Sequence, residues 1–510
     1  MTATAMAKAM AFVCLTALAL FHLRQIAAAS IHYDDAVIAN VAKNLAFGFG
    51  YSTSYPQIVP FDPEASTGPV VVLPAAALVR IFGNRYWVPT FSIVACIWTS
   101  LTLVLLLLRS SLAPRDWFAI TALIAFGLLL YHADEFGLLG DVPAALLAVA
   151  STVILCQSGR GESASLIAGL LLGLAIETKL YAALMLGPAF GRLSLASAEG
   201  ERDGFRHVRE WLAFTTGVLV PVVSWQVCQF VGTGFSVHEW VGLNARQYAF
   251  FEAWSGARIF RPHAGLLSGM PGHIASHVSA LVGFFDGWLP LVLFPAALAV
   301  GVGAIVLRPA DGPQSRDSRR IVVVLLTAAL IHGFWWLTLE LESEYRHLLP
   351  AVVYLLVTAA VATVSSVRAS RVAGAVAVVL LMLGVIPRLP YLALTFGRFE
   401  PEPRLTALLA TRDEMMTLQS NPDVVFVGYG WWVPRDLEYL MPTVGNFKDA
   451  LRLQPADVKR KKIVLVRNEF FNWDRSPAAE AFQAACDRQI VFVRHPFIMS
   501  TCPGLPGAVW

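Results

Sequence analysis

The sequence is short of charge, and it lacks the usual markers of a soluble enzyme. Only 14% of its 510 residues are charged, against about 25% in a typical soluble domain. Six cysteines are present without a metal-binding spacing such as C-x2-C, and no complete G-x-G-x-x-G occurs. The formal net charge of +3 argues against a nucleic-acid binder. These absences exclude a single large water-soluble fold.

Long apolar runs are what the sequence has instead. Hydrophobic residues make up 56% of the chain, and its mean hydropathy is +0.62. The runs fall at 9–29, 86–108, 116–131, 142–157, 164–178, 180–191, 211–231, 284–307, 321–338, 347–366 and 371–392. Because a bilayer core needs about 20 apolar residues per helix, they predict a polytopic α-helical membrane protein with about 11 transmembrane helices. The shorter run at 69–83 indicates an interfacial helix.

Arginine is concentrated in alternate loops, which predicts the orientation. It clusters in 109–115, 158–163, 192–210, 308–320 and 367–371, whereas the turn 132–141 has no basic residue. By the positive-inside rule the arginine-rich loops are cytoplasmic. The loops expected outside are then 30–85, 132–141, the turn at Lys179, 232–283, 339–346 and everything after 393. We therefore expect a multi-pass protein of the bacterial inner membrane whose C-terminal region is periplasmic.

The composition changes after residue 392, which predicts a transmembrane domain over 1–392 and a small extracytoplasmic domain over 393–510. Short apolar runs at 424–429, 462–467 and 490–494 favour buried strands, and segments 402–419 and 477–487 favour amphipathic helices. This alternation is typical of an α/β domain with a partly parallel sheet. An oxidising compartment would permit a disulfide between Cys486 and Cys502, and the sequence leaves that pairing open.

Two adjacent carboxylates open the first outward loop. Asp34 and Asp35 directly follow the first apolar run. Held at a membrane surface, such a group can act as a general base or bind a cation. Local physics offers an alternative, in which one of the two caps a helix over 36–46.

Further ionisable residues lie at the outward ends of other spans. Asp141 begins one span after an outward turn that also holds Glu135, and a helix-capping role would explain Asp141. Lys179 separates two apolar runs, and it could neutralise a lipid phosphate or pair with Glu177. Arg346 precedes another span, and it could bind phosphate bidentately or anchor the interface.

Acids for proton abstraction and bases for phosphate therefore share one face of the membrane. That combination suits group transfer from a phosphate-linked lipid donor to a hydroxyl acceptor.

The order of these motifs resembles the GT-C superfamily of polyprenyl-phosphate-sugar-dependent glycosyltransferases. The branches most similar to it are the bacterial lipopolysaccharide and lipid A glycosyltransferases and the relatives of the protein O-mannosyltransferases. The motifs that carry the resemblance are Asp34-Asp35-Ala36 with the stretch that follows it through Gly50, Ser66-Thr67-Gly68-Pro69, Gly140-Asp141-Val142-Pro143, the stretch from Gly173 to Lys179, and Arg346-His347-Leu348-Leu349-Pro350. The resemblance covers roughly residues 9–392.

The resemblance implies an inverting transfer in which an aspartate of the first outward loop deprotonates the acceptor. Asp34 matches that position best, and Asp35 stands where many members have glutamate, so the choice within the pair is left open. Asp141 would organise the site, while Lys179 and Arg346 would bind the donor phosphate.

The other expected substrate-binding residues are His347, which replaces a usual tyrosine, and Glu135, Thr67 and Tyr51. The expected partners are a polyprenyl-phosphate-linked sugar donor, a lipid or glycan acceptor, and membrane lipids, with no nucleic acid. A divalent cation is left open, because the acids could bind one but no oxygen-rich ligand spacing is diagnostic. Neither the sugar, the acceptor nor the linkage is determined.

Two other functions compete with the transferase. A transporter or flippase of envelope lipids would favour broken helices, midplane ion sites and internal repeats, and no such repeat is present. A membrane-anchored assembly protein would act through residues 393–510 and would leave Asp34 and Asp35 without a purpose.

Overall fold

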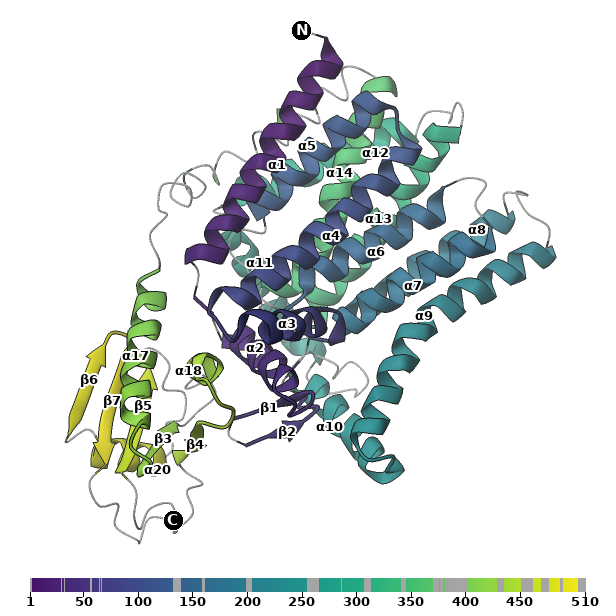
Figure 1. Ribbon diagram of the computed structural model, residues 1–510. Helices are drawn as coiled ribbons and strands as arrows, with labels where there is room; N and C mark the ends of the chain where they lie inside the picture. Colours follow the sequence, from purple (N-terminus) through teal and green to yellow (C-terminus); the bar gives the residue numbers. More distant parts are fainter. Residues whose placement is uncertain are drawn as a thin grey trace. The chain divides into compact units, whose positions relative to one another are not determined.

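The computed structural model (Figure 1) describes most of the chain. The described residues are 2–28, 30–31, 33–55, 57–63, 65, 67–131, 139–157, 161–198, 204–254, 266–285, 287–306, 313–340, 345–369, 402–428, 435–450, 462–468, 477–486 and 489–502, with isolated positions between 376 and 390. Glu135, Ser66 and the predicted span at 371–392, apart from those isolated positions, lie outside them.

The chain forms two compact units. Unit 1 comprises Met1–Leu23, Val94–Phe136 and Gly140–Arg398. Unit 2 comprises Arg24–Ile93, Gly137–Leu139 and Phe399–Trp510. The first outward loop thus clusters with the C-terminal region, although more than 300 residues separate them. The domain boundary expected at residue 393 stays a prediction.

Helices follow the predicted apolar runs closely. They are α1 (Ala3–Ala28), α4 (Trp87–Ser111), α5 (Pro114–Tyr131), α6 (Asp141–Cys156), α7 (Glu162–Thr178), η1 (Leu180–Met185), α8 (Leu186–Ala198), α9 (Gly204–Gly232), α10 (Val237–Trp254), α11 (Leu266–Phe284), α12 (Trp288–Val306), α13 (Pro313–Thr338), η3 (Tyr345–Leu348) and α14 (Leu349–Ala369). Among the described residues, 5 helices are long and apolar enough to cross a membrane, and shorter apolar helices accompany them. The polytopic α-helical fold is confirmed, and the count of about 11 spans stays a prediction.

Helices α7 and α9 pack closely because small residues line their contact. A Cβ atom added to Gly173 would lie 2.5 Å from the carbonyl oxygen of Val218, and one added to Gly169 would overlap that of Phe214. Small residues four apart allow two helix backbones to approach in this way. Helix α7 ends at Thr178, and the extended backbone of Lys179 (φ −150°, ψ 122°) separates it from η1.

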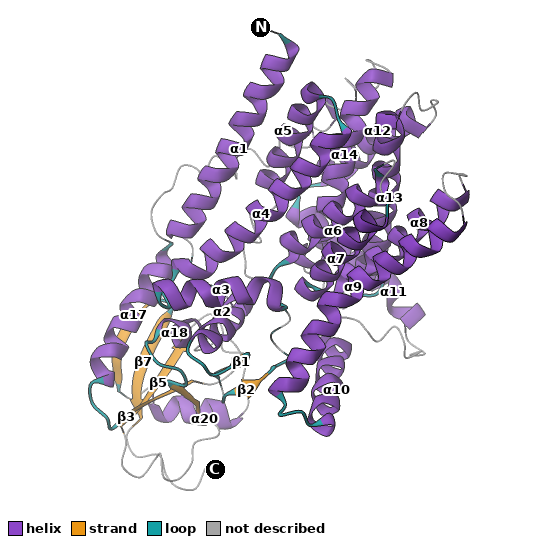
Figure 2. Cartoon of the chain, turned by 45° about the vertical axis from the view of Figure 1, so that its right-hand side comes forward, coloured by secondary structure: helices purple, strands orange, loops and turns teal. Residues whose placement is uncertain are grey.

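Unit 2 contains the short elements of the first loop and a sheet (Figure 2). The first loop forms α2 (Tyr33–Ala46), β1 (Ser52–Thr53), β2 (Val59–Pro60) and α3 (Pro69–Phe82). The C-terminal elements are α17 (Pro403–Gln419), β3 (Val424–Gly428), α18 (Arg435–Leu440), β4 (Phe447–Asp449), β5 (Lys462–Asn468), α20 (Pro477–Cys486), β6 (Ile490–Arg494) and β7 (Phe497–Cys502).

The five-stranded sheet has the order β4-β3-β5-β7-β6. Strand β3 pairs in parallel with β4 and β5, whereas β7 pairs antiparallel with β5 and β6, so the partly parallel sheet is confirmed. Val425 of β3 and Leu465 of β5 share a core cluster with Phe482 of α20, and the alternate residues Phe426 and Val464 are also buried. Burial on both faces explains why β3 and β5 read as continuous apolar runs. Strands β4 and β7 were missed.

Candidate active site

Asp34 and Asp35 lie in the first turn of α2 and are half-buried. The helix begins at Tyr33, earlier than the predicted residue 36, so both carboxylates are inside the helix and neither precedes it as a cap. Negative charge in a first turn is favoured by the helix dipole. The chemistry predicted for the two carboxylates stays a prediction.

The C-terminal half of α2 is held by α18. The Asn40 side-chain amide donates hydrogen bonds to the carbonyl oxygens of Ala36 (2.8 Å) and Arg435 (2.7 Å). The Lys43 ammonium donates to the carbonyl oxygen of Glu438 and lies 3.9 Å from Oε1 of the same residue. Both charged side chains have no exposed surface. The C-terminal region therefore positions the helix that carries the acidic pair.

Burial changes the pKa values of Lys43 and Glu438. Desolvation lowers the pKa of Lys43 to about 8, although the charge of Glu438 opposes the change. Desolvation also raises the pKa of Glu438, against the opposing effects of Lys43 and of the backbone N–H groups of Gly445 and Asn446 that donate to it at 2.7 and 2.9 Å. Sequence reasoning missed both roles, because nothing local to either residue indicates its partner.

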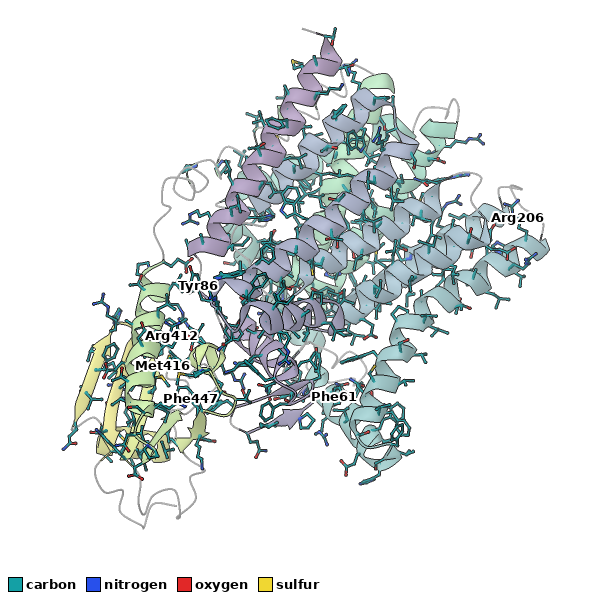
Figure 3. All side chains as sticks on the ribbon, in the orientation of Figure 1. Phe61, Tyr86, Arg206, Arg412, Met416 and Phe447 are labelled. Atoms are coloured by element: carbon teal, nitrogen blue, oxygen red, sulfur yellow. A yellow bond between two sulfur atoms is a disulfide. The ribbon has the colours of Figure 1, made fainter. Side chains whose placement is uncertain are left out.

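Tyr51 and Thr67 are brought together in unit 2. The Tyr51 hydroxyl donates to the carbonyl oxygen of Thr67 (2.7 Å), and the Thr67 hydroxyl donates to the carbonyl oxygen of Leu139 (2.8 Å). Phe61, labelled in Figure 3, stacks on the Tyr51 ring at a centroid distance of 5.8 Å. These contacts give both residues a role in shaping the loop, and their expected contact with substrate stays a prediction.

Asp141 is the first residue of α6 and is buried. The N-cap is Gly140, in the left-handed region at φ 80° and ψ 8°, and no side-chain cap hydrogen bond forms. Capping therefore does not account for Asp141. Its carboxylate instead interacts electrostatically with Lys179, His347 and Arg346. Four residues predicted from three separate motifs converge here, and we call them the Asp141 cluster.

The two parts of the Asp141 cluster come from breaks between helices. Lys179 is buried at the extended break after α7. Arg346 and His347 lie in the 3-10 turn η3, directly before α14. The His332 Nε2 group of α13 donates to the carbonyl oxygen of His347 (2.7 Å), which secures this turn. Cationic side chains are thus presented by irregular backbone, as is common where a membrane protein lines a cavity.

Glu340 is a residue that sequence reasoning missed. It follows α13, has no exposed surface, and its Oε1 lies 3.5 Å from Nδ1 of His347. It lies in the stretch 339–346, which the arginine distribution predicts to be an outward loop. Its only local signal is a charged residue close to the end of an apolar run.

The described site residues that the sequence predicts belong to two different units. Asp34, Asp35, Tyr51 and Thr67 belong to unit 2, while the Asp141 cluster belongs to unit 1. Within the described residues, no group of three or more histidine, cysteine, aspartate or glutamate side chains could hold a metal ion.

No protein-family model and no curated protein matches the sequence. Solved structures resemble the fold, among them two of ArnT from Cupriavidus metallidurans. The apo structure has a TM-score of 0.59 at 14% identity, covering 96% of this chain and 97% of that one. The structure bound to undecaprenyl phosphate has a TM-score of 0.61 at 12% identity, covering 97% of each chain. At this identity the likeness establishes the fold alone, and the chain has an ArnT-like fold over nearly its whole length.

Proposed function

We propose that the protein is an integral-membrane inverting glycosyltransferase of the bacterial inner membrane. It moves a sugar from a polyprenyl-phosphate-linked donor to a hydroxyl group of a cell-envelope glycan or lipid. The observation that carries the proposal is the convergence of Lys179, Arg346 and His347 on Asp141 within an ArnT-like fold. An ArnT structure bound to undecaprenyl phosphate supports a polyprenyl phosphate as the lipid part of the donor.

The cations of the Asp141 cluster suit a phosphate leaving group. When the bond between the sugar C1 and the phosphate oxygen breaks, its electron pair stays on the phosphate. Lys179, which is buried, and Arg346, which is half-buried, offer positive charge to that developing negative charge. Arg346 adds a planar fork that matches two phosphate oxygens. Asp141 keeps these cations in place before the donor arrives.

The acidic pair of α2 supplies the base. Asp34 or Asp35 accepts the proton of the acceptor hydroxyl while the acceptor oxygen forms its bond to C1. Attack opposite the leaving phosphate inverts the configuration at C1. The buried contacts of Asn40 and Lys43 with α18 hold α2 in a fixed orientation during this step.

We place the reaction on the periplasmic side. The disulfide between Cys486 and Cys502 supports this side, because such bonds persist in the periplasm and are rare in the cytoplasm. The distribution of arginine between alternate loops supports the same orientation.

The test is sugar transfer by purified protein in lipid nanodiscs. Wild type, Asp34→Asn and Asp35→Asn are compared on a panel of radiolabelled polyprenyl-phosphate sugars with envelope lipids and glycans as acceptors. We expect one of the two variants to lose about a thousandfold in kcat with its thermal stability unchanged, because a general base of this kind contributes roughly 10²–10⁴-fold. Asp413→Asn, an exposed aspartate of α17 that pairs with Arg412, is the matched control.

Two outcomes would contradict the assignment of the base. If wild type turns over no donor, or if both variants match wild type on every active donor, the acidic pair is not the base. Lipid translocation in reconstituted vesicles would then test the transporter alternative.

A further inference from the structure

Glu340 is a buried carboxylate that follows α13 and lies 3.5 Å from a ring nitrogen of His347. Its backbone N–H donates to the carbonyl oxygen of Trp335 (3.1 Å), which fixes the residue at the end of α13. Its side chain has no exposed surface, and neither carboxylate oxygen makes a hydrogen bond to a described residue. A buried acceptor left without a partner costs about 1–3 kcal/mol, and more when it is charged.

The neighbours of Glu340 are also short of hydrogen bonds. His347 faces it with Nδ1 at 3.5 Å from Oε1, and His273 of α11 interacts with its charge. His273 stacks on His277 at a centroid distance of 4.1 Å, and His277 meets the buried ring of Trp336 edge-on at 4.6 Å. The buried polar atoms without a hydrogen bond among the described residues include Oε1 and Oε2 of Glu340, Nδ1 of His347, and Nε2 of His273 and His277.

These groups have the chemistry of a sugar subsite. A carboxylate accepts two hydrogen bonds at once, and neighbouring hydroxyl or amino groups of a sugar can donate both. Imidazole nitrogens accept or donate further bonds, and an indole ring provides an apolar wall. Pockets for small ligands commonly combine a few convergent polar groups with aromatic walls in this way.

His347 connects this subsite with the residues that we assign to the donor phosphate. His347 belongs to the Asp141 cluster, which we assign to the donor phosphate, and it also faces Glu340. A group bound at Glu340 would therefore meet a side chain that also interacts with the Asp141 cluster. The sugar of the donor is joined directly to that phosphate.

We infer that Glu340, assisted by His347, binds the sugar of the donor and selects neutral or amino sugars over acidic ones. The inference rests on the proposed function, which it extends from the phosphate to the sugar. A uronic acid donor would bring a second carboxylate to a buried negative charge, which is strongly unfavourable. An amino sugar would bring the opposite charge, and a neutral sugar would bring hydroxyl donors.

The experiment separates recognition of the sugar from recognition of the lipid phosphate. Wild type, Glu340→Gln and Glu340→Ala are compared for kcat and KM on donors carrying a neutral, an amino or an acidic sugar. The Kd for undecaprenyl phosphate without a sugar is measured in parallel. The matched control is Glu162→Gln, a partly exposed glutamate at the start of α7 that pairs with Arg209 at 2.9 Å.

We expect KM for the preferred donor to rise about tenfold or more in both Glu340 variants, because a site built to bind polar substrate groups discriminates strongly through them. The preference over the acidic donor should fall by a similar factor, with the larger change in the alanine variant. The Kd for undecaprenyl phosphate should stay within about twofold of wild type, since fixed charges elsewhere bind the phosphate. The Glu162→Gln values should match wild type throughout.

Two results would overturn the inference. One is an unchanged sugar preference in Glu340→Gln, which keeps the shape of the side chain and therefore tests the charge even if the alanine variant fails to fold. The other is a Kd for undecaprenyl phosphate that changes as much as KM, which would assign Glu340 to the phosphate site. If wild type transfers no sugar, the proposed function fails, and Kd values for sugar-bearing against bare lipid then decide the role of Glu340 separately.

Discussion

At the residue scale, the buried position of Lys43 depends on a contact with a residue far away in the sequence. Its side chain is fully buried beside Glu438, almost 400 residues away in the sequence. An ammonium group without water is costly unless it is paired and hydrogen-bonded. The carbonyl and carboxylate of one residue supply both needs, which makes the contact sensitive to pH and to either substitution.

This burial predicts a pH dependence of stability. Because the pKa of Lys43 falls from 10.5 in an unfolded chain to about 8 in the folded protein, the folded state binds fewer protons between pH 8 and 10.5. The free energy of unfolding of wild type should therefore rise relative to that of Lys43→Met as the pH increases through this window. Intrinsic fluorescence during denaturation of the detergent-solubilised protein measures the difference at each pH.

Glu438→Gln provides the comparison for this experiment. Removing the carboxylate leaves the desolvation of Lys43 unopposed, so the pKa of Lys43 should fall further and the window should extend below pH 8. Curves for wild type and Lys43→Met that stay parallel from pH 7 to 11 would contradict the prediction.

At the scale of elements, the contact between α7 and α9 fixes the helix that leads into Lys179. Gly169 and Gly173 of α7 face the backbone of α9 without side chains between them. Helix α7 leads directly into Lys179, so a displacement of α7 would carry that lysine with it. The irregular backbone at the site thus depends on a tightly packed helix pair.

Gly169→Ala tests this dependence. The new Cβ atom would overlap the carbonyl oxygen of Phe214, so α7 and α9 must separate, and overpacking of this kind costs about 1–3 kcal/mol. Thermal unfolding of the purified protein should show the loss, together with weaker binding of undecaprenyl phosphate. Gly187→Ala in α8 is the control, because no atom lies within 4 Å of its added Cβ. Equal melting temperatures for the two variants would show that the α7–α9 contact can expand freely.

At the scale of the whole molecule, the C-terminal region and the first outward loop form one unit. The Ser30 backbone N–H and hydroxyl donate to the Glu402 carboxylate at 3.2 and 3.0 Å. The Asn84 side-chain amide donates to the carbonyl oxygens of Tyr439 and Met441, both at 2.7 Å. The acidic pair of α2 therefore depends on segments from both ends of the chain.

The disulfide provides a whole-molecule test of orientation. We expect Cys486 and Cys502 to resist a thiol-reactive maleimide in intact cells until a reductant is added, because the periplasm keeps such a bond oxidised. The free energy of unfolding of the Cys486→Ser/Cys502→Ser variant should be lower than that of wild type by about 2–4 kcal/mol. Labelling without reductant is read by mass shift on the purified protein.

Cys228→Ser is the control for this labelling, since Cys228 is a free and exposed cysteine of α9. Modification of Cys486 and Cys502 in cells without reductant would place the C-terminal region in a reducing compartment, and the periplasmic orientation would be wrong.

Much of this protein can be predicted from its sequence, because the relevant signals are local. The apolar runs that the structure describes form helices according to their own hydropathy, and the spans at 86–108 and 321–338 are present as α4 and α13. The strands β3 and β5 follow from continuous apolar runs in the same way. Asp141, Lys179 and Arg346 were found because an ionisable residue at the end of an apolar run is conspicuous.

Other features depend on contacts that no local pattern contains. The pairing of Lys43 with Glu438 joins residues almost 400 positions apart, and only the fold removes both from water. The charge of Glu340 is visible in the sequence, but its burial beside His347 is not. Strand β4 has three residues, too few for a periodic signal, and it forms because β3 offers it an edge. The sequence by itself determined the helices and the charged residues at their ends, since hydropathy and charge are properties of short segments. Only the tertiary structure decided which of those charges are buried together, because desolvation is a property of the packed molecule.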